Sequence, residues 1–149
     1  MKIVQINTTS LIGSTGRFVN DLSNTLPQVE KELLITRWER KNRNSRHLRV
    51  HITNSLLDLF LHGLKSYLFD GHGLGSRRFT KSVITKIDDF NPDVIYIHNI
   101  HGYYIHYPSL FEYFKRSNRK VVWTLFDCWA FTGHCSFFSF NECQKHKTG

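Results

Sequence analysis

A repeated order of elements constrains the fold of this chain more than any other feature: a short apolar run, then a polar loop, then a helix with one apolar face. In residues 2–26, KIVQIN predicts a strand because it is apolar and rich in β-branched residues. TTSLIGSTG follows as a glycine-punctuated loop, and RFVNDLSNTL places Phe18, Val19, Leu22 and Leu26 at helical spacing. The chain therefore opens with a strand, a loop and a helix.

The same order returns in the second half. VIYIHN, residues 94–99, predicts a mostly apolar strand, and a helix is expected from Pro108 or Ser109 to about Arg116 because proline suits a first helical turn. KVVWTLF, residues 120–126, predicts another strand, apolar on both faces as in a sheet that helices cover on both sides. A further strand and two helices are expected at residues 32–36, 54–69 and 77–90.

Alternating strands and helices indicate an α/β fold with a Rossmann-like, doubly wound parallel sheet. The chain has 149 residues, of which 40% are hydrophobic, and this is enough for a single domain with an ordinary core. In such sheets ligands bind outside the carboxyl ends of the strands. This rule selects three loops, which follow Asn7, Ile97 and Phe126.

The first loop has features of an anion site. Gly13 and Gly16 would let the backbone approach a phosphate or a sugar closely, Ser14 or Thr15 is expected to cap the following helix, and Arg17 adds a charge in its first turn. The spacing lacks the third glycine of a dinucleotide fingerprint and the lysine of a P-loop, so neither NAD binding nor ATP hydrolysis is indicated. The alternative is that the glycines only turn the chain.

The second loop has the composition of a carbohydrate or polyol site. His98, Asn99 and His101 can form hydrogen bonds with hydroxyl groups, and Tyr103 offers an aromatic face for a sugar ring. The alternative is a surface loop whose tyrosines cover neighbouring helices.

The third loop begins with Asp127, which could bind a hydroxyl group or steer a proton, and Trp129 could wall the site. A lone aspartate at a strand end is as often a turn residue that bonds to its own backbone.

The most basic stretch runs from Arg37 to Arg49 and is expected to be a solvated loop, because it lacks helical periodicity and is rich in Asn and Ser. Together with the net charge of +8, it points to anionic partners. It is either a plain loop, a patch that contacts an acidic membrane face, or a nucleic-acid contact. With Trp38 as its single aromatic residue and no reading motif, it does not favour nucleic acid.

No window reaches the roughly 18 apolar residues of a membrane span, and the N-terminus runs directly into a strand rather than a signal peptide. A cytoplasmic location is expected. Three cysteines are an odd number, so reduced thiols are expected too. His134, Cys135, Cys143 and His146 suggest zinc, but their spacing matches none of the usual structural patterns, and no metal is expected.

Four long motifs carry a resemblance to a known family: MKIVQIN with GSTGR, HGLKSYLFDGHGLGS, NPDVIYIHNIHGYYIHYPSLFEYF and VVWTLFDCWAFTGHC. They resemble the N-terminal half of family 4 glycosyltransferases, in the bacterial branch that builds capsular, exopolysaccharide or colanic-acid-like polymers. The motifs are ordered along nearly the whole chain.

The resemblance implies one half of a GT-B fold, in which two Rossmann-like domains face each other across a cleft and no metal or other cofactor takes part. The first domain receives the acceptor, here a saccharide that is typically lipid-linked, and a hexosyl group is transferred from a nucleotide sugar with retention of configuration. The turn from Gly13 to Gly16 would face the donor phosphates, while the loops of His98 and Asp127 would surround the acceptor. The segment from Arg37 to Arg49 would then contact the membrane from the cytoplasmic side.

This sequence departs from the family pattern at two points. Phe126 stands where the family usually has a histidine close to the transferred sugar, and losing such a donor can cost on the order of a hundredfold in rate. The chain is also expected to be a single domain, residues 1–149, irregular from 127 onward and truncated before a donor-binding domain. Two interpretations stay open: the acceptor half of an enzyme, and a catalytically incompetent binding or interaction module.

Overall fold

The computed structural model describes residues 1–10, 12–37, 48–132 and 136–137. The helices and strands are β1 (Lys2–Ile6), α1 (Gly13–Thr25), β2 (Lys31–Thr36), β3 (Leu48–Thr53), α2 (Leu56–Phe69), α3 (Arg77–Phe90), β4 (Val94–Ile97), α4 (Tyr107–Ser117), β5 (Val121–Trp123) and α5 (Trp129–Thr132).

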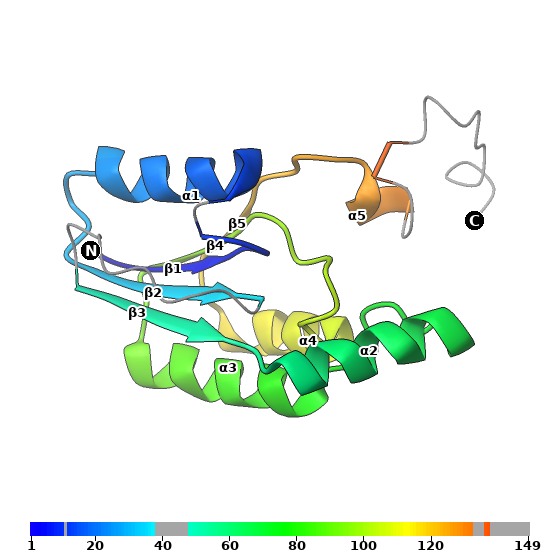
Figure 1. Cartoon of the computed structure of the whole chain (residues 1–149). Helices are drawn as coiled ribbons and strands as arrows, with labels where there is room; N and C mark the ends of the chain where they lie inside the picture. The colour runs from blue at the N-terminus through cyan, green and yellow to red at the C-terminus, as the bar shows by residue number, and fades with distance from the viewer. Residues whose placement is uncertain (11, 38–47, 133–135, 138–149) are drawn as a thin grey trace.

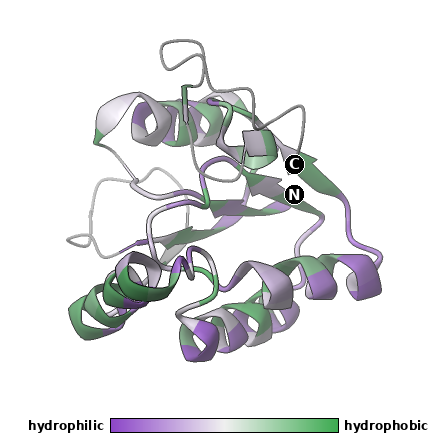
Figure 2. Ribbon diagram, turned by 90° about the vertical axis from the view of Figure 1, so that its right-hand side faces the viewer, coloured by the Kyte–Doolittle hydropathy of each residue, from purple (hydrophilic) through white to green (hydrophobic). Residues whose placement is uncertain are grey.

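Five parallel strands form one sheet in the order β3-β2-β1-β4-β5. Helix α1 covers one face of the sheet, and α3 and α4 lie on the other with α2 beside them (Figures 1 and 2). This three-layer arrangement confirms the predicted α/β, Rossmann-like fold and is consistent with one half of a GT-B fold. Because all strands are parallel, their carboxyl ends share one edge of the sheet.

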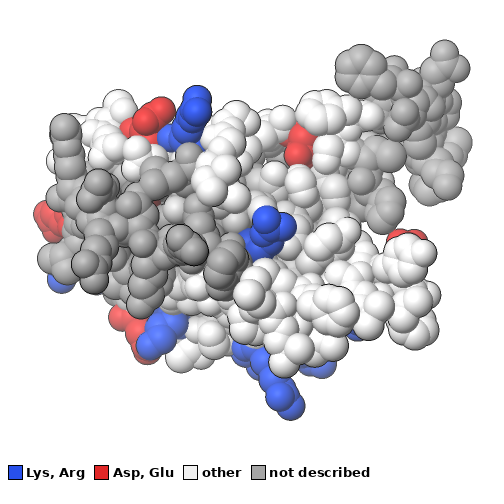
Figure 3. Space-filling view, viewed as in Figure 1, with Lys and Arg blue, Asp and Glu red and all other residues white. Residues whose placement is uncertain are grey.

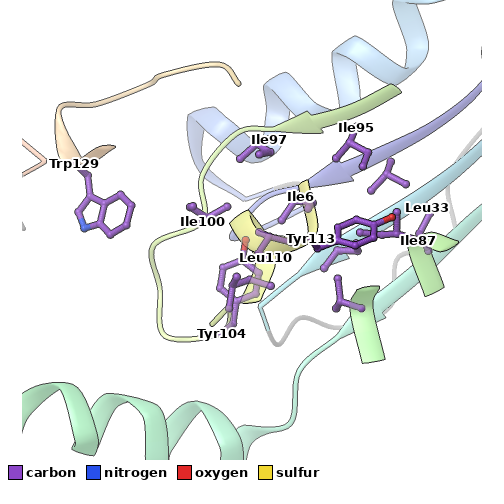
Figure 4. Packing of buried hydrophobic residues seen from close by; sticks show 14 residues of the cluster. Ile6, Leu33, Ile87, Ile95, Ile97, Ile100, Tyr104, Leu110, Tyr113 and Trp129 are labelled. Carbon is purple, nitrogen blue, oxygen red and sulfur yellow. The ribbon is translucent and has the colours of Figure 1, made fainter. Parts of the chain in front are cut away.

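The face toward α3 and α4 is aliphatic. Alternate strand residues such as Val4, Ile6 and Ile95 are fully buried there, in the same cluster as Val83 and Ile87 of α3 (Figure 4). Each such side chain contributes about 1.5–3 kcal/mol when fully buried. This face carries most of the hydrophobic core.

The face toward α1 is partly polar. Gln5 and Glu32, on β1 and β2, are fully buried and meet Ser23 of α1 through hydrogen bonds of 2.7–2.9 Å. His98, one residue beyond β4, continues the same strand face and is also buried. A polar network therefore lies under α1.

Helix α1 begins earlier than the sequence predicts. Its first residue is Gly13, so the glycine segment is the first helical turn rather than a loop, and Arg17 lies beyond that turn. The N-cap residue is Ile12, and no side chain caps the helix, so the predicted capping by Ser14 or Thr15 is wrong. Gly13 has φ +75 at the turn into the helix, and the first backbone N–H groups are left without a side-chain cap.

Two predictions about strands need correction. The stretch from Arg37 to Arg49 is not one loop, because β3 begins at Leu48 and contains Arg49; residues 38–47 lie outside the described part of the chain. The last strand is shorter than predicted and is not covered on both faces. β5 forms an edge of the sheet, with Val121 36% and Val122 45% exposed.

Within the described ranges, no helix has both the length and the apolar character needed to cross a bilayer.

Candidate functional site

The three loops selected from the sequence meet at the carboxyl edge of the sheet. The backbone N–H of Asn99 donates to Asn7 Oδ1 at 3.2 Å, and Thr8 Oγ1 donates to the carbonyl oxygen of His101 at 2.8 Å. His101 Nε2 in turn lies 2.9 Å from Asp127 Oδ2. These contacts tie the ends of β1, β4 and β5 into one polar cluster.

A small cavity of about 10 Å³ lies at this junction. Its lining comes from the second and third loops and the strand before the third: His98, Asn99, Ile100, His101, Trp123, Leu125, Phe126, Asp127, Trp129 and Ala130. A volume of this size holds about one water-sized group. The described residues at this junction therefore form a recess that is too small to enclose a whole sugar ring.

His101 and Asp127 form a carboxylate–imidazole pair in this cluster. Asp127 Oδ2 lies 2.9 Å from His101 Nε2, while Asp127 Oδ1 accepts the backbone N–H of Trp129 at 3.0 Å. The aspartate is therefore a turn residue, which was one of the two interpretations from the sequence, and it also contacts an imidazole, which the sequence did not indicate. Asn99 Nδ2 lies 2.8 Å from the same Nε2. Nε2 can either donate a hydrogen bond to the Asp127 carboxylate or accept one from the Asn99 amide, so these two contacts correspond to different tautomers of the ring.

His98 has a different environment from His101. Its side chain is only 3% exposed, its Nε2 lies 2.7 Å from Gln5 Oε1, and burial lowers its pKa to about 4. Phe18 and Phe126 place their rings 5.5 and 6.2 Å from the imidazole. His98 is thus a neutral, buried group at the base of the cavity rather than an exposed loop residue.

The first turn of α1 lies beside this cluster. Asn7 Nδ2 is 3.5 Å from Thr15 Oγ1, and the rings of Phe18 and Phe126 are 5.1 Å apart. Gly13, Ser14 and Arg17 are exposed, whereas Gly16 is buried. The uncapped N-terminus of a 13-residue helix with exposed first residues is chemically suited to an anion.

Tyr103 does not line the cavity. It is 40% exposed and packs beside His72, which also contacts Trp129, with ring centroids 5.0 and 5.4 Å apart. The ring centroid of Trp129 also lies 5.5 Å from that of His101. The structure therefore places Tyr103 on an aromatic surface next to the recess, with Trp129 between them.

Sequence reasoning missed Thr8, Phe18 and His72. Thr8 and Phe18 could have been found from their positions directly after a strand end and in the second turn of the first helix. His72 carried no such signal, because it reaches the site from the turn between α2 and α3.

The cysteine and histidine residues weighed for zinc at positions 134, 135, 143 and 146 lie outside the described residues. Within the described part, no group of three His, Cys, Asp or Glu side chains is arranged to hold a metal ion.

Comparison with known proteins gives one partial relative. Over 63 residues, this chain is 35% identical to a protein of Escherichia coli K12 that is named as a colanic acid biosynthesis glycosyl transferase, WcaC. The match covers 39% of this chain and 15% of that protein, so this chain spans a small part of the relative's length. No family model and no solved structure matches. Part of this chain is thus related to a glycosyltransferase-like protein.

Proposed function

We propose that this chain is the acceptor-binding domain of a retaining glycosyltransferase that moves a hexosyl group from a nucleotide sugar to a saccharide in surface polysaccharide synthesis. The observation that carries the proposal is the His101–Asp127 pair, held at 2.9 Å at the junction of three strand ends. The partial relative supports the reaction class. The acceptor is proposed to be lipid-linked.

In the proposed reaction, the bond from the anomeric carbon to the phosphate oxygen breaks, and a bond to an acceptor hydroxyl oxygen forms. Asp127 holds His101, whose side chain is 29% exposed, so that the imidazole can bind the acceptor hydroxyl and accept its proton. The nucleoside diphosphate leaves with the electron pair of the broken bond. The N-terminus of α1, with Gly13, Ser14 and Arg17 exposed, is proposed to face the phosphates of the donor. The donor sugar itself would be held mainly outside this chain.

A first experiment measures binding. Titration of the 149-residue chain with UDP-glucose and with lipid-linked saccharides, followed by tryptophan fluorescence, should give saturable binding that Asp127→Asn weakens by at least tenfold, because the neutral amide removes the carboxylate charge that holds the His101 imidazole. Asp93→Asn is the matched control, since Asp93 Oδ2 accepts the Lys2 N–H at 2.7 Å at the opposite end of the sheet. Equal affinities for both variants would contradict the proposed role of Asp127.

A second experiment separates the two functional alternatives by measuring release of nucleoside diphosphate in the same mixtures. Turnover that Phe126→His increases would support the enzyme, because histidine restores a hydrogen-bond donor beside the transferred sugar. Saccharide binding without turnover in either protein fits both alternatives, because the donor sugar would be held mainly outside this chain. Absence of both binding and turnover would overturn the proposed function.

We also propose that the domain lies against an anionic membrane surface through α2 and the basic segment from Arg37 to Arg49. Helix α2 exposes eight large apolar side chains: Leu56, Leu57, Phe60, Leu61, Leu64, Tyr67, Leu68 and Phe69, each at least 41% exposed. Figure 2 shows how hydrophobic this helix is, and the surface over it in Figure 3 is largely uncharged. Apolar insertion and basic attraction together give stable binding where either alone is weak.

Sedimentation with vesicles tests this contact. The chain should bind vesicles that contain phosphatidylglycerol and bind pure phosphatidylcholine vesicles several-fold more weakly. Leu57→Ser with Phe60→Ser, at positions 68% and 65% exposed, should reduce binding to both. Replacing Arg40 and Arg43 by glutamate should reduce only the phosphatidylglycerol-dependent part. Unchanged sedimentation of both variants would remove the membrane contact from the proposal.

A further inference from the structure

The buried carboxamide of Gln5 has only one possible orientation. Its Nε2 lies 3.1 Å from the carbonyl oxygen of Val19 and 2.7 Å from both Ser23 Oγ and Glu32 Oε1. The carbonyl oxygen of Val19 can only accept a hydrogen bond, so the amide nitrogen must face α1 and β2. Gln5 Oε1 therefore faces His98, at 2.7 Å.

This orientation fixes the tautomer of His98. A carboxamide oxygen has no hydrogen to donate, so His98 Nε2 must carry the hydrogen of the 2.7 Å contact. Since burial lowers the pKa of His98 to about 4, the ring is neutral at pH 7 and its Nδ1 is a bare acceptor.

Among the described residues, the acceptor nitrogen has no hydrogen-bond partner. His98 Nδ1 is buried and makes no hydrogen bond within the described residues, where the neighbouring rings of Phe18 and Phe126 have no donor. A buried acceptor without a partner destabilises the folded protein, so a ligand that supplies a donor would remove this cost. His98 is one of the residues that line the small cavity, together with Asp127 and Trp129.

We propose that His98 Nδ1 accepts a hydrogen bond from one hydroxyl group of a bound carbohydrate, and that Gln5 is the positioning residue that keeps this nitrogen unprotonated. The inference rests on the proposed function, because it takes the ligand of the site to be a carbohydrate. The cavity of about 10 Å³ admits a single hydroxyl-sized group and not a ring, so the sugar ring stays on the outer, aromatic side.

The arrangement makes His98 a specificity-determining residue. A site built to pair a hydroxyl group rejects an analogue that lacks it, because the buried acceptor is then left unpaired. A deoxy sugar that lacks the inserted hydroxyl should bind about tenfold or more weakly. Deoxygenation at positions that stay outside the cavity should have little effect.

Nitrogen NMR of the histidine side chains tests the inference directly. In the 149-residue chain labelled with ¹⁵N-histidine, His98 should show the Nε2–H tautomer with an unprotonated Nδ1. Methyl α-D-glucopyranoside, methyl α-D-galactopyranoside and methyl α-L-fucopyranoside are added up to 100 mM. At least one should shift the Nδ1 resonance upfield by several ppm as its hydroxyl group donates, and the matching monodeoxy glycosides should identify which hydroxyl group enters.

The variants separate positioning from folding. Gln5→Met removes the acceptor opposite Nε2, so the His98 signals should show a mixture of tautomers and the glycoside-induced shift should fall. Gln28→Met, at an exposed position, is the matched control and should behave as wild type. If Gln5→Met does not fold, the His98 tautomer and the glycoside-induced shift of Nδ1 in the wild-type chain still test the inference.

Three results would overturn the inference. The first is a His98 ring with its hydrogen on Nδ1, and the second is an Nδ1 resonance that no glycoside shifts. The third is an Nδ1 resonance that is already at the hydrogen-bonded position without glycoside and stays there. This third result would indicate a bound water only. If glycosides shift other signals while Nδ1 stays still, this inference fails and the proposed function stands. If neither the glycosides nor UDP-glucose binds anywhere, both fail.

Discussion

At the residue scale, two glycines adopt the same left-handed backbone in opposite surroundings. Gly73 has φ +76, and a Cβ built there would clash with the ring of Tyr107. Gly13 has φ +75, and a Cβ there would meet nothing within 4 Å. The first glycine lets an aromatic ring pack on the backbone beside the site, while the second serves only the turn into α1.

This contrast gives a matched pair of substitutions. Gly13→Ala should lower the free energy of unfolding by about 1 kcal/mol, the cost of a non-glycine residue in the left-handed region. Gly73→Ala should cost several kcal/mol, because Tyr107 must move as well. Urea denaturation followed by circular dichroism measures both values. Similar losses in the two variants would show that Tyr107 does not pack against Gly73.

His98 and His101 show where sequence reasoning stops at this scale. The two residues are three apart in the same segment and have the same side chain, so composition assigned them one role. Strand parity could have separated them, because Val94, Tyr96 and His98 alternate onto one face, which α1 covers. The contact between His101 and Asp127 depends on the path of the loop after β4. A periodic sequence pattern does not predict the path of a loop.

At the element scale, the helix ends differ in how their backbone groups are satisfied. Ser55 caps α2, and its Oγ accepts the Asp58 N–H at 3.1 Å. Ser14, which the sequence predicts as a cap, lies inside the first turn of α1 and makes no capping bond. The sequence pattern of serine before an apolar run is the same in both places, so it cannot tell them apart.

Replacing each serine by alanine tests this difference. Ser55→Ala should lower the melting temperature and reduce the free energy of unfolding by about 1 kcal/mol, because one helix N–H loses its partner. Ser14→Ala should be neutral or slightly stabilising, because alanine favours helix. Differential scanning calorimetry of both variants measures the effect. A destabilised Ser14→Ala would mean that this hydroxyl group does cap α1.

Most elements could be predicted because their signals are local. The bounds expected for α3, residues 77–90, coincide with the helix that forms, since a one-sided apolar face and Asn91 with Pro92 mark it clearly. The strand β3 was missed although LRVHIT alternates apolar and polar residues, because it follows the basic segment without a break. The exposure of α2 was not predictable, because its leucines have the same spacing as those of a core helix.

At the scale of the whole molecule, two buried histidines link stability to pH. Burial lowers the pKa of both His62 and His98 to about 4, with the nearby His72 as a second cause for His62. In the unfolded chain their pKa is about 6.5, so between pH 6.5 and 4 the unfolded state binds more protons than the folded state. Their contribution to stability is complete above pH 6.5 and is lost as the pH falls toward 4.

The fold should therefore weaken in mild acid. Between pH 7 and pH 5 the free energy of unfolding should fall by on the order of 2 kcal/mol, measured by urea denaturation at constant ionic strength. Proton NMR should show both imidazoles still neutral at pH 5 in the folded protein. An unchanged urea midpoint together with titration near pH 6.5 would contradict this account.

The two faces of the sheet also differ in how they can vary over evolution. On the α3 and α4 face, valine, isoleucine and leucine can replace one another with local repacking at modest cost. Under α1, Gln5, Ser23, Glu32 and His98 share directed hydrogen bonds, so a change at one leaves the others with mismatched donors and acceptors. In natural variants of this domain, residues on the α3 and α4 face should therefore change independently of one another. The four residues under α1 should change together.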